Sequence, residues 1–349
     1  MAKITTPIWE DIYVAIGGGY AKNFRVRVNS SSGDIIYAGR AMPAPGSGTV
    51  TVKLNDIFAD YFTHTVPTLG AASFSALTFP LLFYVQVEYS AGVWTTLSDY
   101  YEVLMNWSYD PAYVLGSTLS APVRALLSAD QYVFVTVYNV ASVTAVFTFD
   151  DGSTDTETIS LAVDPDFDAS FNHDFSRSVR SAGSGTAVFK ISNYTPSGKK
   201  TVSVTINGET FDVANDCDWR YTLYYLNAYG GWDSLVMTGN ALRADYMTRN
   251  TMEMSYDNRG VMNRGRKDYA IDIKRKYTLR TGILTDDESS RMWHLLESTD
   301  VYMHDLLTGE VRPVVLTDSE AVHQTFKGNG GSFANYTLQA EIAQVFERR

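Results

Sequence analysis

The stretch CDWRYTLYYLNAYGGWD at residues 217–233 is the most informative part of the chain. Its first half is rich in aromatic residues, which favour β-strands. A Gly-Gly pair at 230–231 then indicates a turn, and a Trp-Asp pair follows it. No standard catalytic or ligand-binding chemistry uses this order of residues, so the stretch indicates a structural element.

Composition places the chain among folded β-rich proteins. Its 349 residues are enough for two or three domains, and 45% of them are hydrophobic. That apolar content excludes a disordered chain. The 23 Tyr and 17 Phe favour strands over helices.

Charge and cysteine content exclude several classes of protein. The net charge is −11, so the chain lacks the overall basic character of a nucleic-acid-binding protein. One cysteine, Cys217, cannot form an intramolecular disulfide and is expected to be a small buried residue. The N-terminus has no signal-peptide pattern and no apolar run is long enough for a membrane span. We therefore expect a protein that is made in the cytoplasm and has no membrane partner.

Two regions of alternating strands fill the first two thirds of the chain. In residues 1–108, apolar and polar residues alternate over 23–28, and a hairpin is expected over 83–97 around Gly92, which predicts an antiparallel β-sandwich. A short helical turn is expected at 57–62. Residues 109–216 contain five strand candidates at the spacing of an immunoglobulin-like β-sandwich, and Asn207-Gly208 predicts a hairpin turn. The five candidates are 132–138, 143–149, 156–161, 187–191 and 201–206.

The third region, 217–349, mixes strands with one helix and is expected to be an α+β domain, a β-sandwich with one packed helix. Thr285 and Glu288 have the spacing of a capping box, which predicts a helix over 286–297. The expected apolar face of this helix consists of Met292, Trp293, Leu295 and Leu296. Strands are expected around 269–273, 312–316 and 336–342.

Residues that could carry chemistry are few. Asp164, Asp166 and Asp168 have the alternating spacing of calcium loops, but the turn glycine and closing Glu of an EF-hand are missing. A solvated loop or a weak calcium site are the two interpretations. The five histidines form no metal-ligand pattern, so no cofactor and no catalytic residue is expected.

The one basic stretch, 243–280, holds ten Lys and Arg against five acidic residues. It could bind nucleic acid, but an interface with an acidic neighbouring subunit is the favoured interpretation, because arginine pairs well with carboxylates. The candidate interface residues are Arg259, Arg264, Arg266, Lys267, Trp219 and Trp232.

Three segments resemble tail and baseplate structural proteins of tailed bacteriophages that infect Bacteroides-type hosts. They are Pro7–Asp11 with 34–41 and 54–57, then Trp219–Asp233, and finally 276–318 with the helix at its centre. The third segment also resembles the strand–helix–strand layout of tail-tube and distal-tail proteins, whose copies pair their sheets into rings.

This resemblance implies a virion structural subunit, located in the tail and assembled as a ring with six-fold symmetry or a multiple of it. Other tail and baseplate proteins would be its partners, and DNA would pass through the lumen of the ring. An acidic lining of the lumen would repel the DNA and keep it from adhering. Three alternatives remain open: a receptor- or carbohydrate-binding virion protein that uses the Tyr and Trp side chains, a cell-wall hydrolase, and a subunit of a phage-derived injection device.

Overall fold

The chain is mainly β, as the sequence predicts. Most strand pairs are antiparallel, and the helices of the described residues are short. The computed structural model describes residues 3–7, 13–17, 22–28, 35–42, 49–54, 57, 66–70, 72–76, 81–104, 118–120, 122–161, 183–215, 219–253, 266–317, 324–328, 331–343 and 346–348.

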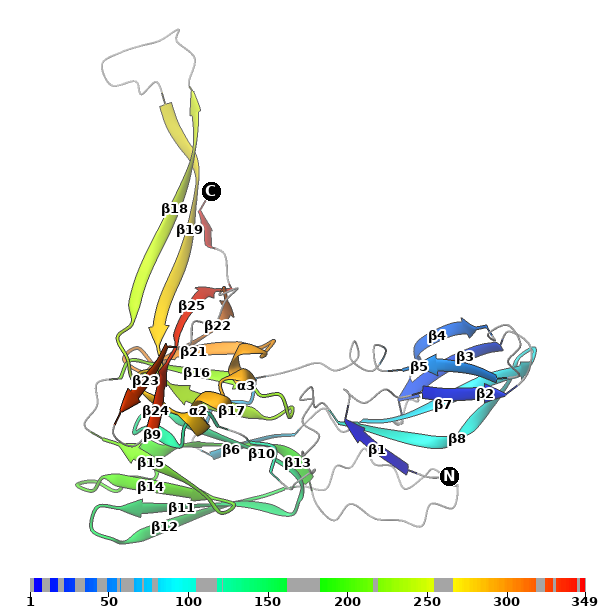
Figure 1. Ribbon diagram of the computed structural model, residues 1–349, viewed down its shortest axis with the longest axis horizontal. Coiled ribbons are helices and arrows are strands. Elements are labelled where there is room, and N and C mark those ends of the chain that lie inside the picture. Colours follow the sequence, from blue (N-terminus) through cyan, green and yellow to red (C-terminus); the bar gives the residue numbers. More distant parts are fainter. Residues whose placement is uncertain are drawn as a thin grey trace.

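The N-terminal region lies to the right in Figure 1 and contains a five-stranded sheet beside a two-stranded one. The predicted alternation is confirmed, since Phe24 and Val26 are buried whereas Arg25 and Arg27 are half-buried between them. Of the predicted turn at 57–62, only residue 57 lies within the described residues. The five strands are, in spatial order, β1 (Lys3–Pro7), β8 (Val93–Leu104), β7 (Leu81–Ser90), β3 (Lys22–Val28) and β4 (Ile35–Ala41), and the pair is β2 (Tyr13–Gly17) with β5 (Thr49–Lys53).

The middle region is a β-sandwich whose two sheets bury one shared core. Strand β11 alternates strictly between half-buried and buried residues, so every second side chain enters this core. The predicted hairpin is also confirmed: Asn207 and Gly208 have φ angles of 49° and 91°, as the turn requires. One sheet contains β10 (Tyr132–Val140), β13 (Gly183–Lys190) and β6 (Ala72–Ala76), and the other contains β12 (Thr154–Ser160), β11 (Ser142–Phe149), β14 (Thr201–Ile206), β15 (Glu209–Ala214) and β9 (Leu126–Ser128); a 3-10 helix, η1 (Ile191–Asn193), follows β13.

Strand β6 crosses the expected boundary between the first two regions. It belongs to the first region by sequence, yet it pairs with β13 and forms an edge of the middle sandwich. Just before it, Val66 and Leu69 pack against a set of buried residues from the middle and C-terminal regions. We call this set the junction core, and it consists of Phe134, Val188, Tyr224, Leu226 and Trp232.

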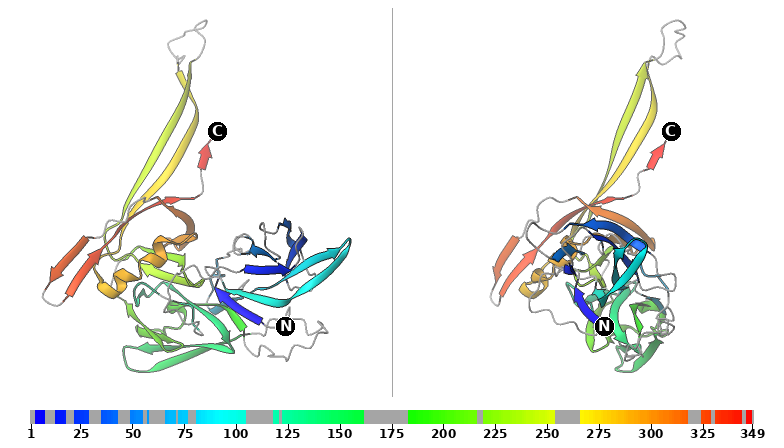
Figure 2. Two further views of the ribbon diagram at one scale, coloured as in Figure 1. Left: turned by 45° about the vertical axis from the view of Figure 1, so that its right-hand side comes forward. Right: turned by 90° about the vertical axis from the view of Figure 1, so that its right-hand side faces the viewer.

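The C-terminal region is built on an eight-stranded sheet, from which two long strands project in both views of Figure 2. A second, three-stranded sheet and the helices pack onto it around one hydrophobic core. The large sheet contains β17 (Trp232–Val236), β16 (Tyr221–Leu226), β21 (Val301–Asp305), β22 (Glu310–Leu316), β25 (Thr337–Ile342), β19 (Arg266–Arg280) and β18 (Leu242–Glu253), with β26 (Phe346–Arg348) beside β19; the small one contains β20 (Leu284–Thr285), β24 (Gly331–Asn335) and β23 (Gln324–Gly328).

The helix expected over 286–297 is two short helices, α2 (Asp286–Ser290) and α3 (Trp293–Leu296). The capping box is confirmed, because Thr285 and Glu288 exchange both hydrogen bonds. The break between the two helices follows from a hydrogen bond between a serine side chain and the backbone, because Ser290 Oγ donates to the Asp287 carbonyl at 2.7 Å. The next amides bond three residues back, which tightens the turn and leaves Trp293 61% exposed. Trp293 was therefore wrongly assigned to the buried face, whereas Met292 and Leu295 are buried as predicted.

Candidate assembly surface

Strands β18 and β19 form a hairpin, here called the arm, that leaves the body of the protein (Figures 1 and 2). Their pairing runs from Leu242–Thr278 at the base to Glu253–Arg266 at the far end. Twelve paired residues of an antiparallel strand extend for about 40 Å. Strand β19 pairs on its other side with β25 over residues 276–280 and with β26 over residues 271–273, so the described arm is a two-stranded ribbon beyond Ile271.

The arm exposes apolar side chains that a protein interior would normally cover. Ten of the twelve residues of β18 are exposed, among them Tyr246 at 58% and Met247 at 56%. Among the described strands, β18 ends the sheet, so its backbone pairs with β19 on one side only. Because isolated two-stranded hairpins are only marginally stable in water, the end of the arm beyond the β26 pairing favours a covering partner.

One face of the arm satisfies its own charges. Asp245 accepts from Arg243 at 2.7 Å and from Arg275 at 3.2 Å, and Arg249 donates to Asp268 at 2.8 Å. The hydrogen bond from Arg243 holds the pKa of the Asp245 carboxyl below its usual range. The register places the exposed Met247 and the half-buried Ile271 and Ile273 on the same side, and we call this side the paired face.

The opposite side of the arm, here called the lysine face, is less well neutralised. Register places Lys267, Lys274 and Lys276 there beside the exposed Tyr246 and Met252. Lys276 Nζ lies 5.5 Å from the Tyr246 ring centroid. Glu341 is 3.8 Å from Lys274 and 3.6 Å from Lys276, so this carboxylate is shared at long range by two ammonium groups.

The predicted interface residues do not form one surface. Lys267 is exposed near the far end of the arm, and the backbone of Arg266 pairs with Glu253 beside it. Arg259 and Arg264 lie outside the described residues. Trp219 lies beside the base of the arm, and Trp232 lies in the junction core.

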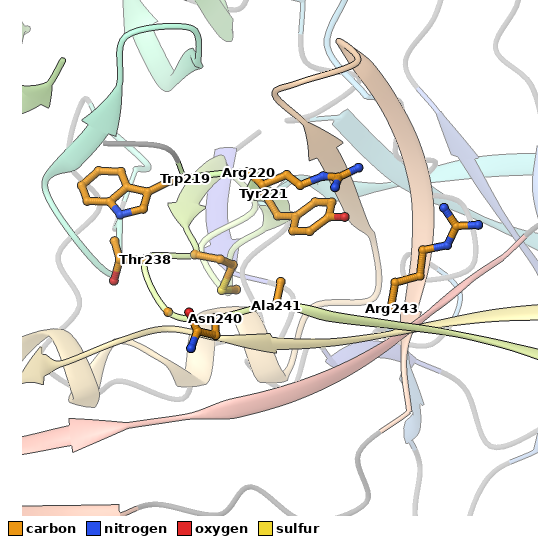
Figure 3. A pocket seen from close by; sticks show the side chains of 9 residues that line it. Trp219, Arg220, Tyr221, Thr238, Asn240, Ala241 and Arg243 are labelled. Atoms are coloured by element: carbon orange, nitrogen blue, oxygen red, sulfur yellow. The ribbon is translucent and has the colours of Figure 1, made fainter. Parts of the chain in front are cut away.

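Trp219 is half-buried at one end of a hollow of about 590 Å³ beside the base of the arm, with Arg243 at the other end (Figure 3). Arg220 lines it too, but its guanidinium is paired with Asp305 at 2.9 Å. None of the described residues that line this hollow is a His, Cys, Asp or Glu.

Trp232, in contrast, is a core residue, and its assignment to an interface is corrected. Only 3% of it is exposed, and it packs in the junction core. Its amide donates to Thr136 Oγ1 at 2.9 Å, which joins the C-terminal sheet to the middle sandwich. A side chain enclosed in this way contributes to the fold of one chain and is not available to a neighbour.

The turn after β16 explains why residues 227–231 have their sequence. The Asn227 side chain accepts from the amides of Tyr229 and Gly231 at 2.9 Å, and it donates to the Leu119 carbonyl at 2.8 Å. It also donates to Asp233 at 2.6 Å. A Cβ at Gly231 would lie 2.6 Å from the Leu119 oxygen, so only glycine fits this close approach.

Two buried polar groups were not singled out in the sequence. His304 is 3% exposed, and its Nδ1 lies 2.9 Å from the Tyr224 hydroxyl in the junction. Arg124 donates to Glu288 at 3.2 Å and to Thr238 at 3.0 Å, which ties the start of the middle sandwich to the helix α2. Neither residue stands in a recognisable pattern, because both act through contacts between distant segments.

Within the described residues, no three His, Cys, Asp or Glu side chains converge as a metal site would require. The calcium candidate, Asp164 to Asp168, and Cys217 lie outside them. No helix in the described ranges has the length and apolar character that a bilayer span requires.

Comparison with known proteins gives no family. No protein-family model and no curated protein matches the chain. A solved complex of Dpr2 Ig1-Ig2 with DIP-Theta Ig1-Ig3 aligns with 99% of this chain and 88% of that chain, at 8% identity and a TM-score of 0.21. A mutant of Salmonella alpha-2-macroglobulin aligns at 10% identity and a TM-score of 0.17, with 98% of this chain spanning 33% of that one. At these TM-scores neither alignment carries an argument, and the fold assignment rests on the strand pairing.

Proposed function

We propose that this chain is a structural subunit of a tailed-phage virion, most simply a ring protein of the tail or baseplate, whose work is assembly and not catalysis. The observation that carries the proposal is the arm, a ribbon with exposed apolar side chains and a free edge. The order of the three sequence segments that resemble phage tail proteins supports the same function.

The paired face of the arm is suited to a protein contact. Its arginines and carboxylates already pair within the chain, so covering them leaves few charges unmatched. Met247 and Ile273, which are register partners, supply apolar surface between these ion pairs. Covering such a surface with a neighbouring copy stabilises the assembly by about 25 cal/mol per Å² of apolar area.

Head-to-tail contact accounts for a ring. The arm and the surface it covers would be different parts of the chain, so each copy offers one of each to its neighbours. Such heterologous contacts close into a ring when the rotation between copies allows it. A ring consumes every free arm and stops growth, whereas an open edge invites aggregation.

The test compares the full chain with a shortened-arm variant in which Asn-Gly replaces residues 250–270. Arg249 and Ile271 are register partners, so a two-residue turn can join them and leave the pairing of β26 intact. Mass photometry should show rings of about six or more copies for the full chain and a larger share of monomers for the variant, which keeps Met247 and Ile273 but loses the pairs from Asn250 to Glu253. A full chain that stays monomeric at micromolar concentration would reject the proposal.

A further inference from the structure

A β-bulge gathers the lysines of the arm on one face. The register pairs Asn250 with Ala270 but Thr251 with Asp268, so Tyr269 is the extra residue of a bulge in β19. Side chains of a strand alternate between faces, and a bulge reverses that alternation beyond it. Without it, Lys267 would lie on the opposite side from Lys274; with it, the two lysines share a face.

Among the described residues, the ion pairs of this face are longer than those of the paired face. On the paired face, Arg243, Arg249 and Arg275 bond two carboxylates at 2.7–3.2 Å. On the lysine face, Lys274 keeps 57% of its side chain exposed and is 3.8 Å from Glu341. Such an exposed, long contact stabilises little. Three lysines against Asp272 and Glu341 give the lysine face a small positive excess, and its long contacts leave the ammonium groups open to a closer carboxylate of a partner.

The charge distribution of the chain indicates which partner. Residues 242–280 hold ten basic and five acidic residues, whereas the rest of the chain holds 18 basic and 34 acidic ones. Two arms side by side would repel, but an arm against the remainder of another copy would attract. Residues 109–216 are the most acidic region, with 13 acidic and six basic residues. There, Asp155 and Glu157 lie on β12, which ends its sheet.

Nucleic acid fits this face less well. Asp272 and Glu341 share it with the lysines, and both would repel a phosphate backbone. Mixed charge with a small positive excess suits a protein surface of scattered carboxylates. Exposed Tyr246 and Met252 add apolar contacts of the kind found in protein interfaces.

We infer that the lysine face binds the acidic middle sandwich of a second copy of this chain. This inference rests on the proposed function and adds the lysine face to the contact that the paired face makes. It requires ammonium groups of the arm to lie within contact distance of carboxylates from residues 109–216 of the neighbour. The salt dependence of assembly follows, because screening shortens from about 10 Å to about 3 Å between 0.1 M and 1 M salt.

Zero-length carbodiimide coupling of amines to carboxylates tests the contact directly. A mixture of ¹⁵N-labelled and unlabelled chains distinguishes cross-links between copies from those within one. Mixed-isotope cross-links should join Lys267, Lys274 or Lys276 to acidic residues of 109–216. If the cross-links between copies from these lysines go only to other regions, the inference is wrong although assembly stands.

A charge-reversal variant gives the second measurement. Lys267→Glu with Lys274→Glu should weaken self-association by roughly 100-fold, since it brings like charges together. The matched control, Arg40→Glu with Lys53→Glu, changes the net charge equally but lies off both the arm and the middle sandwich, and should assemble normally. Unchanged assembly of the arm variant would overturn the inference while leaving the proposed function intact. Binding to duplex DNA that the arm variant alone loses, with unaltered assembly, would instead assign the face to nucleic acid.

Discussion

The two edges of the large C-terminal sheet differ in how far the rest of the chain covers them. At one edge, every residue of β17 is buried, and its Trp232 packs in the junction core. At the other, β18 exposes ten of its twelve residues. Both edges are rich in side chains that proteins use for contacts, yet one is already covered within the chain. The comparison shows that aromatic content alone does not identify an assembly surface, because coverage within the chain decides it.

Replacing Trp232 with alanine should produce the largest loss of stability. Its side chain joins residues of three regions in the junction core, and removing a buried tryptophan leaves a cavity that costs about 3–5 kcal/mol. Urea unfolding of the variant should show this loss as a lower midpoint. A loss of unfolding free energy below about 1 kcal/mol would mean that Trp232 contributes little to the covering of the β17 edge.

Gly231→Ala should have the next largest effect. The new methyl group would meet the Leu119 carbonyl oxygen at 2.6 Å, and overpacking of this kind costs about 1–3 kcal/mol. Thermal unfolding measures it. Gly208→Ala is a useful comparison, because a Cβ there meets no atom within 4 Å, so any loss comes from its φ of 91° and not from a clash.

The sequence predicts local features of the fold better than contacts between distant segments. Strand alternation such as that of 24–28 and 143–149 is a local property, and the corresponding strands are confirmed. The capping box at Thr285 is equally local. The role of residues 227–233 is different, because Leu119 and Thr136 hold this turn from segments about a hundred residues away. The sequence could indicate a structural element there but not its position at a junction.

The arm was predicted only in part. Tyr269, Ile271 and Ile273 alternate with polar residues, which predicts a strand, and β19 contains it. Strand β18 has no clear alternation, because both of its sides are exposed and neither is selected to enter a core. Its length, its free edge and the bulge at Tyr269 are properties of pairing, which no single segment specifies.

A pH-dependent loss of stability should come from His304, the buried histidine on β21 beside the Tyr224 hydroxyl. Burial, reinforced by the charge of Lys190, lowers the pKa of this histidine, whereas Asp305 and Asp130 act in the opposite direction. Unfolding then takes up a proton, so the contribution is fully present above the unfolded pKa of about 6.5 and is lost as pH falls below it. The free energy of unfolding should decrease as pH falls below about 6.5, by up to about 1.4 kcal/mol per pH unit.

The His304→Gln variant provides the control for this prediction. Glutamine can still hydrogen-bond the Tyr224 hydroxyl but carries no titratable ring, so its stability should vary less over the same pH range. Equal slopes for the two proteins would show that some other group controls the acid response.

The smallest effect on stability, and the sharpest test of the comparison, is expected on the exposed edge. Met247→Ser removes an apolar side chain that is 56% exposed, and Val315→Ser on β22 removes one that is 55% exposed. Both should change the free energy of unfolding by no more than about 0.5 kcal/mol, because neither side chain leaves a cavity. Only Met247 lies on the paired face of the arm, so only its replacement should weaken self-association, by about tenfold in sedimentation equilibrium. If both variants assemble like the parent chain, then the exposed side chains of β18 are ordinary surface residues, and the arm is not the contact between copies.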